Sequence, residues 1–346
     1  LMSPGTDKSK TSEMSYKNYR SKIMTIKEIA QLAGVSSAAV SRYLNGGYVS
    51  EEKKQQIRKV IEKTGYRPSI QARILRTKHS RLIGVVVPKI SSESISRITD
   101  GIGQVLGQRN YHMLLATTDN QPLKELEYME IFQNYPVDGI ILIATILTKK
   151  HRKFLKESKI PIVVIGQHTQ DASCIFHDDY RAAKELASRL AGKSRGKIAY
   201  LAVTREDLAA GASREDGLNA GLQQAGKSLG TDCRAEASFT IESGFEKTCE
   251  LLKKYSDIDI IFCATDTIAA GALEAILKHF PERREKITVA GFGDNQFLKA
   301  VTGGIPTVHF GYKTSGIKGA ELITDVLEQD QNIPIQMKLG YELRNI

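Results

Sequence analysis

Polar side chains follow several of the short apolar segments in the larger part of the chain. Gln167 comes just after the apolar segment Ile160–Ile165, and Thr265 and Asp266 come just after Ile258–Cys263. In open α/β sheets, ligands bind beyond the carboxyl ends of the strands. If these apolar segments are strands, we expect the polar side chains that follow them to converge on one cleft.

Asp294 follows the later apolar segment Ile287–Ala290, and Arg214 lies a little further on after Lys197–Val203. Phe239 and Phe310 are candidates for apolar plates against the faces of a sugar ring. Small-molecule pockets combine apolar walls with a few fixed polar groups. We therefore expect a site for a small polar ligand such as a sugar.

Catalysis is not supported by any pattern in the sequence. The chain contains no Gly-x-Ser-x-Gly elbow, no Walker loop and no His-Glu-x-x-His motif. The seven histidines are scattered. His177 stands beside Asp178 and Asp179, which we interpret as a loop after a strand rather than a metal site. We expect no catalytic residue, no metal and no cofactor.

Positive charge is concentrated in the first quarter of the chain. Residues 1–81 hold 17 Lys and Arg against 6 Asp and Glu, whereas the remaining 265 residues hold 32 against 33. Such an excess attracts a polyanion, and nucleic acid is the usual one. The alternative is a solvated basic surface without a partner.

The segment that follows residue 24 has the pattern of two short helices joined by a tight turn. Thr25 and Glu28 form a capping box at the start of the first helix, and Gly34 ends it. Ser36 can cap a second helix, Ser37–Leu44. This is a helix-turn-helix pattern, whose second helix enters the major groove of DNA.

A third helix is predicted from Glu51 to about Thr64, with Ser50 as its cap and Ile57 in its buried stripe. Gly65 closes that helix. Without a partner, the three helices would simply form a small bundle. The charge and the helix-turn-helix pattern favour a DNA-binding domain.

The run TIKEIAQLAGVSSAAVSRYLN at residues 25–45 resembles the head of the LacI/GalR repressors. Tyr66-Arg67-Pro68 and Ala72-Arg73-Ile74-Leu75 resemble the junction of that family, and the resemblance continues across nearly the whole chain. It implies that Ser37, Ala38 and Arg42 face the bases. It also implies that four residues hold phosphates or position the helix: Thr25, Ser36, Ser41 and Asn45.

These residue types suit their implied roles. The Arg42 guanidinium can bond O6 and N7 of a guanine together, and Ala38 can offer a methyl-sized contact, for example to a thymine methyl. Ala39 stands where the family usually has Thr, which removes one phosphate or backbone contact.

The segment Ser69–Lys78 is basic and too short to be a stable helix alone. The resemblance implies a hinge helix that folds on DNA, with Leu75 as a wedge in the minor groove and Arg73 against a phosphate. The alternative is a basic linker with Leu75 buried against the next domain.

For the larger part of the chain, the resemblance also assigns ligand contacts. Arg214, in SREDGL, matches a ligand-binding Arg, Phe239 matches an aromatic residue that stacks on ligand, and CATDTIAAGAL places Thr265 and Asp266 at the cleft. Other roles remain open: an ion pair from Arg214 to a neighbouring carboxylate in Glu215 or Asp216, a core position for Phe239, and a helix cap for Asp266.

Two departures from the family pattern affect the cleft. The family often has an Asp where Gly293 stands, and here Asp294 is one place later. Phe310 stands near a position that is often Gln. Both changes indicate a ligand pose different from that of the lactose or purine members, with a glucoside or a sugar phosphate as candidates.

The fold class that we predict is α/β. Amphipathic stretches such as Ser94–Gln108, Tyr180–Leu190 and Gly244–Lys254 alternate with apolar segments, which favours doubly wound parallel sheets. The candidate strands are Leu82–Val87, Met113–Thr117, Gly139–Ile143, Ile160–Ile165, Lys197–Val203, Ile258–Cys263, Ile287–Ala290 and a late strand within Gln336–Leu343. About 265 residues exceed one usual core, so two similar lobes are expected, and the resemblance implies a periplasmic-binding-protein-like pair.

We expect four parts: a disordered extension or expression remnant (1–23), a three-helix DNA-binding domain (24–67), a hinge helix or linker (68–81), and a two-lobed effector-binding and dimerisation domain (82–346). The four cysteines lack C-x-x-C spacing, which fits a reducing cytoplasm. No apolar run approaches the roughly 20 residues that span a bilayer, so we expect no membrane partner.

The function predicted from the sequence is a cytoplasmic, sequence-specific transcriptional repressor of sugar-utilisation genes. It would bind a pseudo-palindromic double-stranded operator as a homodimer and answer a sugar or sugar-phosphate effector. One alternative is a sugar-binding or sugar-processing protein with a degenerate head. Another is a family member controlled by a protein corepressor.

Overall fold

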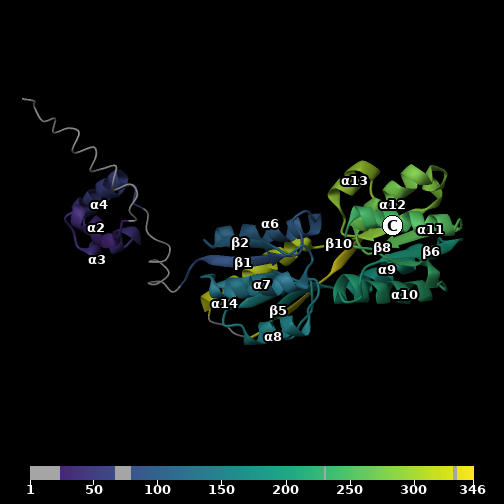
Figure 1. The fold of residues 1–346 in the computed structure, drawn as a ribbon, viewed down its shortest axis with the longest axis horizontal. Coiled ribbons are helices and arrows are strands. Elements are labelled where there is room, and N and C mark those ends of the chain that lie inside the picture. The colour runs from purple at the N-terminus through teal and green to yellow at the C-terminus, as the bar shows by residue number, and fades with distance from the viewer. Residues whose placement is uncertain (1–23, 67–78, 230, 330–332) are drawn as a thin grey trace, which may run out of the picture. The chain divides into compact units, whose positions relative to one another are not determined.

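The structure is a computed structural model that describes residues 24–66, 79–229, 231–329 and 333–346. Its contacts divide the chain into two compact units, residues 1–80 and residues 81–346. We call these units the head and the body (Figure 1). The predicted hinge residues Arg73 and Leu75 lie outside the described residues.

The head contains helices α2 (Ile26–Leu32), α3 (Ser37–Leu44) and α4 (Glu51–Thr64). Capping sets where α2 and α3 begin. Thr25 and Glu28 form the predicted capping box, and Ser36 Oγ accepts a bond from the Ala39 amide at 3.2 Å. Ser50 stands at the start of α4, but its side chain makes no capping hydrogen bond, contrary to the prediction.

A small apolar core holds together the three helices that the structure describes in the head. Ile29, Val40 and Ile57 are fully buried, one from each helix. Gly34 (φ 64°) lies in the turn between α2 and α3, and Gly65 (φ 65°) ends α4. Both adopt the left-handed conformation that glycine accepts without steric cost.

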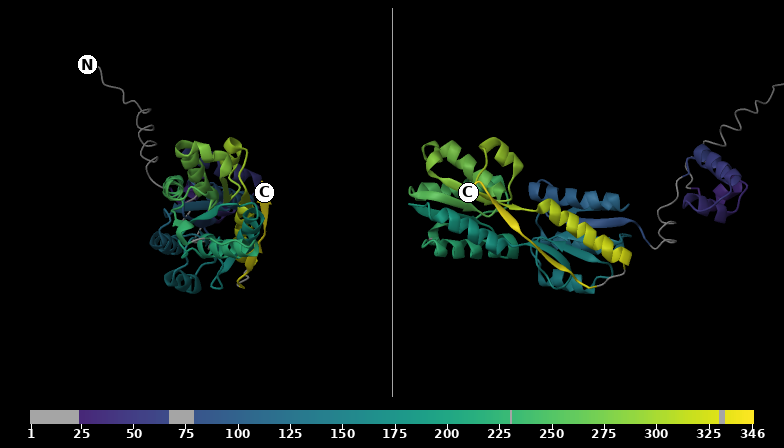
Figure 2. Two further views of the ribbon diagram at one scale, coloured as in Figure 1. Left: turned by 90° about the vertical axis from the view of Figure 1, so that its right-hand side faces the viewer. Right: turned by 180° about the vertical axis from the view of Figure 1, so that it is seen from behind.

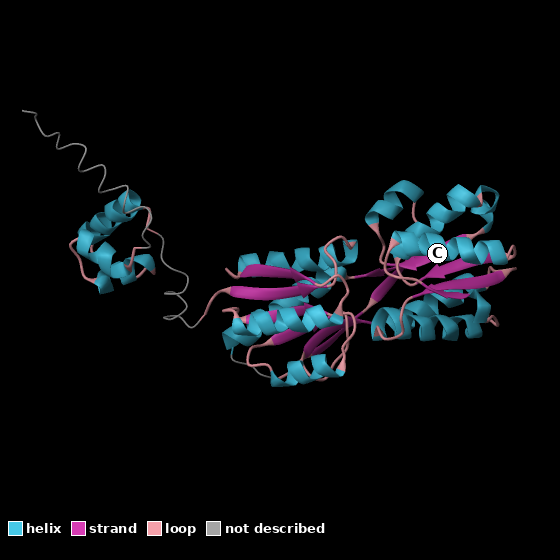
Figure 3. Ribbon diagram, in the orientation of Figure 1, coloured by secondary structure: helices cyan, strands magenta, loops and turns pink. Residues whose placement is uncertain are grey.

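The described residues of the body form two six-stranded sheets, each covered by helices on both faces (Figure 3). We call the sheet that begins the body lobe 1 and the second sheet lobe 2. Lobe 1 has the strand order β11-β5-β4-β3-β1-β2 and all its pairings are parallel. Lobe 2 has the order β12-β10-β9-β8-β6-β7, parallel except for the antiparallel pair β10–β12. The predicted α/β class is confirmed.

The elements of lobe 1 come from both ends of the body. They are β1 (Leu82–Val87), α6 (Glu93–Gln108), β2 (His112–Thr117), α7 (Pro122–Asn134), β3 (Gly139–Ile143), α8 (Lys149–Glu157), β4 (Ile162–Ile165), β5 (Ser173–His177), α14 (Tyr312–Gln329) and β11 (Gln336–Leu339). Helix α14 packs beside α6 against the sheet.

Most of lobe 2 comes from the chain between β5 and α14, and its last strand, β12, comes from the end of the chain. Its elements are α9 (Asp179–Ala191), β6 (Lys197–Ala202), the π-helix η1 (Leu208–Ser213), α10 (Arg214–Gln224), the 3₁₀ helix η2 (Thr231–Cys233), β7 (Arg234–Glu236), α11 (Ile241–Lys254), β8 (Ile258–Cys263), α12 (Asp266–His279), the 3₁₀ helix η3 (Pro281–Lys286), β9 (Thr288–Phe292), α13 (Gln296–Thr302), β10 (Thr307–Phe310) and β12 (Tyr341–Arg344).

In the described part of the body the chain crosses between the lobes three times: from β5 to α9, from β10 to α14, and from β11 to β12. The right-hand view of Figure 2 shows the last two crossings in yellow. The structure confirms a late strand within Gln336–Leu343, namely β11, but the whole segment does not form one strand. Gly340 divides it into two strands that pair in different sheets, because the chain leaves one lobe for the other at that residue.

The alternating sequence pattern located most of the body's strands but not all of them. The structure adds β5, β7 and β10, which were not predicted. Each is short, with polar residues among the apolar ones, so its pattern is weak. No described helix has the length and apolar character needed to cross a lipid bilayer.

Candidate functional site

A cavity of about 480 Å³ opens in the body between the two lobes. That volume lies within the usual range for small-molecule sites, about 300–1,000 Å³. Lobe 1 contributes the loop after β1, the start of α6 and the ends of β3 and β4. Lobe 2 contributes the residues after β6, β7, β8 and β9. The carboxyl ends of the parallel strands therefore build the cavity, as expected for such sheets.

Arg214 lines this cavity, and the protein itself fixes its guanidinium. Nε donates to Asp179 Oδ1 at 2.8 Å, and Nη1 donates to the Ala264 carbonyl at 2.7 Å. The guanidinium carbon lies 4.9 Å from the ring centre of Phe292 and 5.1 Å from that of Phe310. The side chain is pre-oriented, which lowers the entropy cost of binding a ligand.

The Arg214 guanidinium is buried and still charged. Burial is the largest single influence and would lower its pKa, but Asp179, Tyr312 and Asp207 together outweigh burial and raise the pKa above the ordinary value. The alternative role for Arg214, an ion pair with Glu215 or Asp216, is wrong, because Arg214 pairs with Asp179. Glu215 instead pairs with Arg234 at 2.8 Å, and Asp216 pairs with Arg205 at 2.9 Å.

Gln167 also lines the cavity and reaches across it to the other lobe. Its Nε2 donates to Asp207 Oδ1 at 2.8 Å, and both side chains are buried. Asp207 Oδ1 also accepts from the amides of Ala209 and Ala210, at the start of η1. Burial raises the Asp207 pKa, while the hydrogen bonds from Gln167 and Ala210 oppose that shift.

Thr265 and Asp266 lie at the cavity, where α12 begins. Thr265 Oγ1 caps α12 by accepting from the Ile268 amide at 3.3 Å, so Thr265 and not Asp266 is the cap. Asp266 accepts from Thr307 Oγ1 and from the Asn295 amide, each at 2.8 Å. Burial raises the Asp266 pKa to about 6, despite these two bonds.

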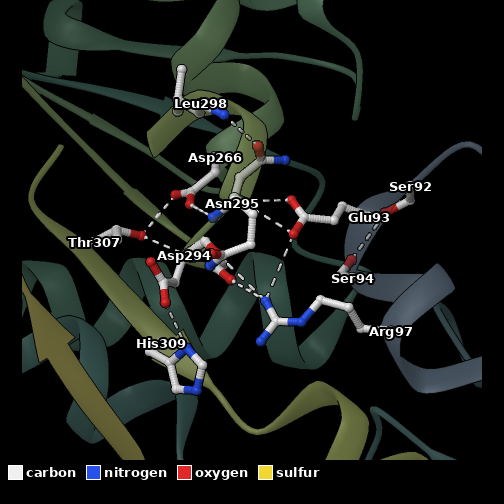
Figure 4. A network of polar contacts seen from close by, with 12 residues as sticks. Ser92, Glu93, Ser94, Arg97, Asp266, Asp294, Asn295, Leu298, Thr307 and His309 are labelled. Carbon is white, nitrogen blue, oxygen red and sulfur yellow. Dashed lines mark hydrogen bonds and ion pairs between the residues drawn. The ribbon is translucent and has the colours of Figure 1, made fainter. Parts of the chain in front are cut away.

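A second group of contacts joins the lobes at the start of α6 (Figure 4). Arg97 Nη1 donates to the Gly293 carbonyl at 3.2 Å. The Glu93 carboxylate accepts from the Gln296 amide at 3.1 Å. Lys89 Nζ donates to the Phe239 carbonyl at 3.3 Å. Arg97 and Glu93 of lobe 1 thus hold the loop between β9 and α13. Asp266 holds the same loop from lobe 2.

Phe239 is partly buried and lines the cavity, but two other predicted contacts do not line it. Phe310 is fully buried beneath Arg214 and supports the guanidinium from below. Asp294 turns away, and its Oδ2 is 2.8 Å from His309 Nδ1 (Figure 4). We therefore correct both assignments. Arg214 already covers the Phe310 ring, and the Asp294 carboxylate already has His309 as its partner.

Three residues that line this site were not predicted to do so: His177, Asp179 and Asp207. Asp179 and His177 line the cavity, but they flank the end of β5, a strand that was not predicted. His177 is the last residue of β5, so its predicted place in a loop is wrong. Asp207 also lines the cavity, after a predicted strand, and its acidic side chain was the available signal.

In the head, the residues assigned to DNA lie on helix α3 and at its ends, except Thr25, which caps α2. Ser37, Ala38 and Arg42 are exposed, whereas Ala39 is buried. Ser36, Asn45 and Thr25 are exposed and Ser41 is half-buried. The Asn45 side-chain amide donates to the Ser41 carbonyl, and the Thr25 hydroxyl is 3.0 Å from Glu28 Oε2.

No described group of three or more His, Cys, Asp and Glu side chains is arranged to hold a metal ion. The four cysteines are free thiols. The polar groups of the cavity are instead arranged to make hydrogen bonds.

Comparison with known proteins agrees with this geometry. The family model described as "Bacterial regulatory proteins, lacI family" matches residues 25–69. The model described as "Periplasmic binding proteins and sugar binding domain of LacI family" matches residues 80–299. These matches cover the helix-turn-helix of the head and most of the two-lobed body.

Individual proteins resemble nearly the whole chain. The sucrose operon repressor of Staphylococcus xylosus is 31% identical over 324 residues, which cover 92% of this chain and 99% of the relative. The catabolite control protein A of Staphylococcus aureus is 27% identical over 328 residues, covering 92% and 98%.

Among solved structures, the Lac repressor bound to ONPG has a TM-score of 0.81 at 20% identity and covers 93% of this chain and 98% of that chain. The CelR–cellobiose complex has a TM-score of 0.69 at 23% identity, covering 92% and 98%. These likenesses support the fold.

A helix-turn-helix head joined to a two-lobed, periplasmic-binding-protein-like body defines a class of ligand-controlled transcription factors. The chain belongs to the LacI family within that class. It is a DNA-binding transcriptional repressor with a sugar-binding domain, and the relatives named above are regulators rather than enzymes.

Proposed function

We propose that this repressor controls sugar-utilisation genes in the cytoplasm, and that a sugar bound between the lobes changes its affinity for operator DNA. The observation that carries the proposal is the cavity at the carboxyl ends of both sheets, with Arg214 pre-oriented by Asp179. The similarity to a sucrose operon repressor over 92% of the chain makes a sucrose-like disaccharide the first effector to test.

The proposed contacts with the effector come from both lobes. Gln167 belongs to lobe 1, and Arg214, Phe239, Thr265 and Asp266 belong to lobe 2. An effector that touches both lobes must favour one angle between them. The shift that it produces is limited by its difference in affinity for the two arrangements, typically about 1–3 kcal/mol.

The head is proposed to read a pseudo-palindromic operator as part of a homodimer. Its exposed residues Ser37, Ala38 and Arg42 would face bases, and Thr25, Ser36, Ser41 and Asn45 would hold phosphates or position the helix. We assign Arg73 and Leu75, within residues 68–81, to the hinge contacts with phosphate and minor groove. The net charge of the first 81 residues favours this assignment.

We assign no chemical step to the cavity. The carboxylates of Asp179, Asp207 and Asp266 each accept hydrogen bonds from the protein itself. A general base or nucleophile needs a group that is free to reach the reacting atom.

The test combines operator binding with a panel of sugars. Fluorescence anisotropy should detect genomic fragments that the full chain binds specifically, with an affinity that falls steeply as salt rises. Sucrose, cellobiose, sucrose 6-phosphate and glucose 6-phosphate should then be added one at a time. One of them should shift operator affinity and raise the melting temperature, because a ligand at 100 times its Kd stabilises by about 2.7 kcal/mol.

Three results would overturn the proposal. Equal binding to random DNA would show that the head is a degenerate remnant. Specific operator binding that no sugar alters would remove the sugar effector. A response only after a second protein is added would indicate a corepressor.

A further inference from the structure

We infer that His177 is a further effector-binding residue, and that its ring Nε2 hydrogen-bonds a hydroxyl group of the sugar. This inference rests on the proposed function of the cavity. The inference adds an effector contact at the crossing from β5 to α9. Neither the sequence pattern nor the family resemblance placed an effector contact there.

The position of His177 supports the assignment. It is the last residue of β5, it is 8% exposed, and it lines the cavity together with Asp179 and Arg214. Its ring is held by two aromatic neighbours, with centroids 4.9 Å from Phe310 and 5.4 Å from Tyr312. Both neighbours lie at the second crossing, from β10 to α14. The imidazole is therefore fixed at the place where two crossings meet the cavity.

The second observation is a missing partner. Within the described residues, His177 Nε2 is buried and has no hydrogen-bond partner. A buried polar atom without a partner costs about 1–3 kcal/mol, and most such atoms in folded proteins are paired. An unpaired nitrogen on a cavity-lining side chain indicates that a ligand completes its bonding.

The charge state of the ring decides which ligand group fits. Burial lowers the His177 pKa to about 4. Nearby Asp179 raises this pKa and Arg214 lowers it, and the ring is neutral at pH 7. A neutral imidazole has one donor nitrogen and one acceptor nitrogen. A hydroxyl group both donates and accepts, so it satisfies Nε2 in either tautomer.

His177 and Arg214 are supported by one ring. Phe310 contacts the His177 imidazole and lies under the Arg214 guanidinium at 5.1 Å. Both residues line the same cavity, so a sugar that contacts Arg214 lies in the cavity that His177 lines. A site that bonds a particular hydroxyl discriminates against analogues that lack it, because the protein group is then left unpaired. His177 thus selects among sugars.

The experiment measures sucrose binding by calorimetry for the full-length wild type, His177→Leu and His177→Gln. His168→Leu is the matched control, because His168 is exposed and does not line the cavity. We expect His177→Leu to weaken sucrose binding about 10- to 100-fold. His177→Gln, which keeps hydrogen-bonding atoms, should recover most of the affinity, and His168→Leu should bind as the wild type does.

Monodeoxy analogues of sucrose identify the contact. One analogue should bind the wild type and His177→Leu equally, because the hydroxyl that meets Nε2 is absent from it. If all analogues weaken alike in the folded variant, His177 is a structural residue. Unchanged sucrose affinity in His177→Leu would also overturn the inference.

A measurement on the wild type covers the case in which His177→Leu does not fold. With ¹⁵N-labelled histidine, the Nε2 resonance of His177 should move when sucrose is added and that of His168 should not. A fixed His177 resonance in sucrose-saturated protein would overturn the inference. If the wild type binds its operator but no sugar of the panel, the proposed effector fails first, and this inference fails with it.

Discussion

Gln167 and Asp207 join the two lobes through a buried hydrogen bond of 2.8 Å between Nε2 and Oδ1. Gln167 follows β4 in lobe 1, and Asp207 follows β6 in lobe 2. Both side chains line the cavity, so an effector that enters it meets a bond that already holds the lobes together.

The first prediction concerns this bond. Gln167→Leu should lower the free energy of unfolding by about 1–3 kcal/mol, because the buried Asp207 loses its side-chain donor. Asp207→Asn in the same background should add less than it does alone, and a double-mutant cycle in urea measures that coupling. Gln108→Leu, on the exposed end of α6, is the control and should change little. Strictly additive losses would show that the two side chains do not interact.

The second prediction separates stability from sensing at Arg214. Arg214→Met leaves the Asp179 carboxylate buried without its partner, so unfolding should become easier by about 3–5 kcal/mol. The double variant Asp179→Asn/Arg214→Met should recover part of that loss but not the response to sugar. Denaturation curves and operator binding with added sugar measure the two effects.

An exposed ion pair supplies the control for that experiment. Arg189→Met breaks a pair with Glu185 at 2.6 Å, and exposed pairs contribute about 0–1 kcal/mol. If Arg214→Met is as stable as Arg189→Met, the Asp179 pair does not hold the site. If the folded double variant still answers sugar, Arg214 is not an effector contact.

The sequence predicted best the strands that consist mainly of buried apolar residues. The bounds of β1, β3 and β8 agree with the predicted segments residue for residue. The missed strand β5 contains Ser173 and His177 within five residues, so neither its period nor its composition is typical of a strand. Pairing between β4 and β11 supports β5, and such long-range contacts leave no local signal.

The same limit applies to the site. Position after a strand placed Gln167, Arg214, Thr265 and Asp266 at the cavity. It could not show which polar groups already have partners inside the protein. Asp294 also follows a strand, yet His309 already holds its carboxylate. Phe310, predicted as an apolar plate, is the last residue of β10, and Arg214 covers its ring. Whether a side chain faces a cavity depends on its tertiary neighbours.

The third prediction concerns base recognition by the head. Arg42 is exposed on α3, and Arg42→Ala should cost about 1–3 kcal/mol for the specific operator while relaxing the preference at one base pair in each half-site. Arg58→Ala removes the same charge from α4, where Arg58 pairs with Glu62 at 2.8 Å, and should leave that preference intact. Competition assays with single-base operator variants make the comparison. Equal losses on specific and random DNA would make Arg42 a phosphate contact.

The last prediction concerns pH and follows from His177. Its pKa is lowered from 6.5 to about 4 in the folded protein, by burial first and by Arg214 second, while Asp179 acts in the opposite direction. Between these two values the unfolded chain binds a proton at this residue and the folded protein does not. The stability that His177 contributes is therefore complete above pH 6.5 and is lost as the pH falls towards 4, by about 3 kcal/mol.

Asp266, whose pKa is raised to about 6, changes stability in the opposite direction, so the wild-type curve alone does not isolate His177. The difference between wild type and His177→Gln does isolate it, because Asp266 is common to both. Urea denaturation at pH 7, 5.5 and 4 should show wild type losing stability relative to His177→Gln by roughly that amount. A difference that does not change across this range would mean that His177 titrates normally in the folded protein, and that its ring is open to water rather than buried.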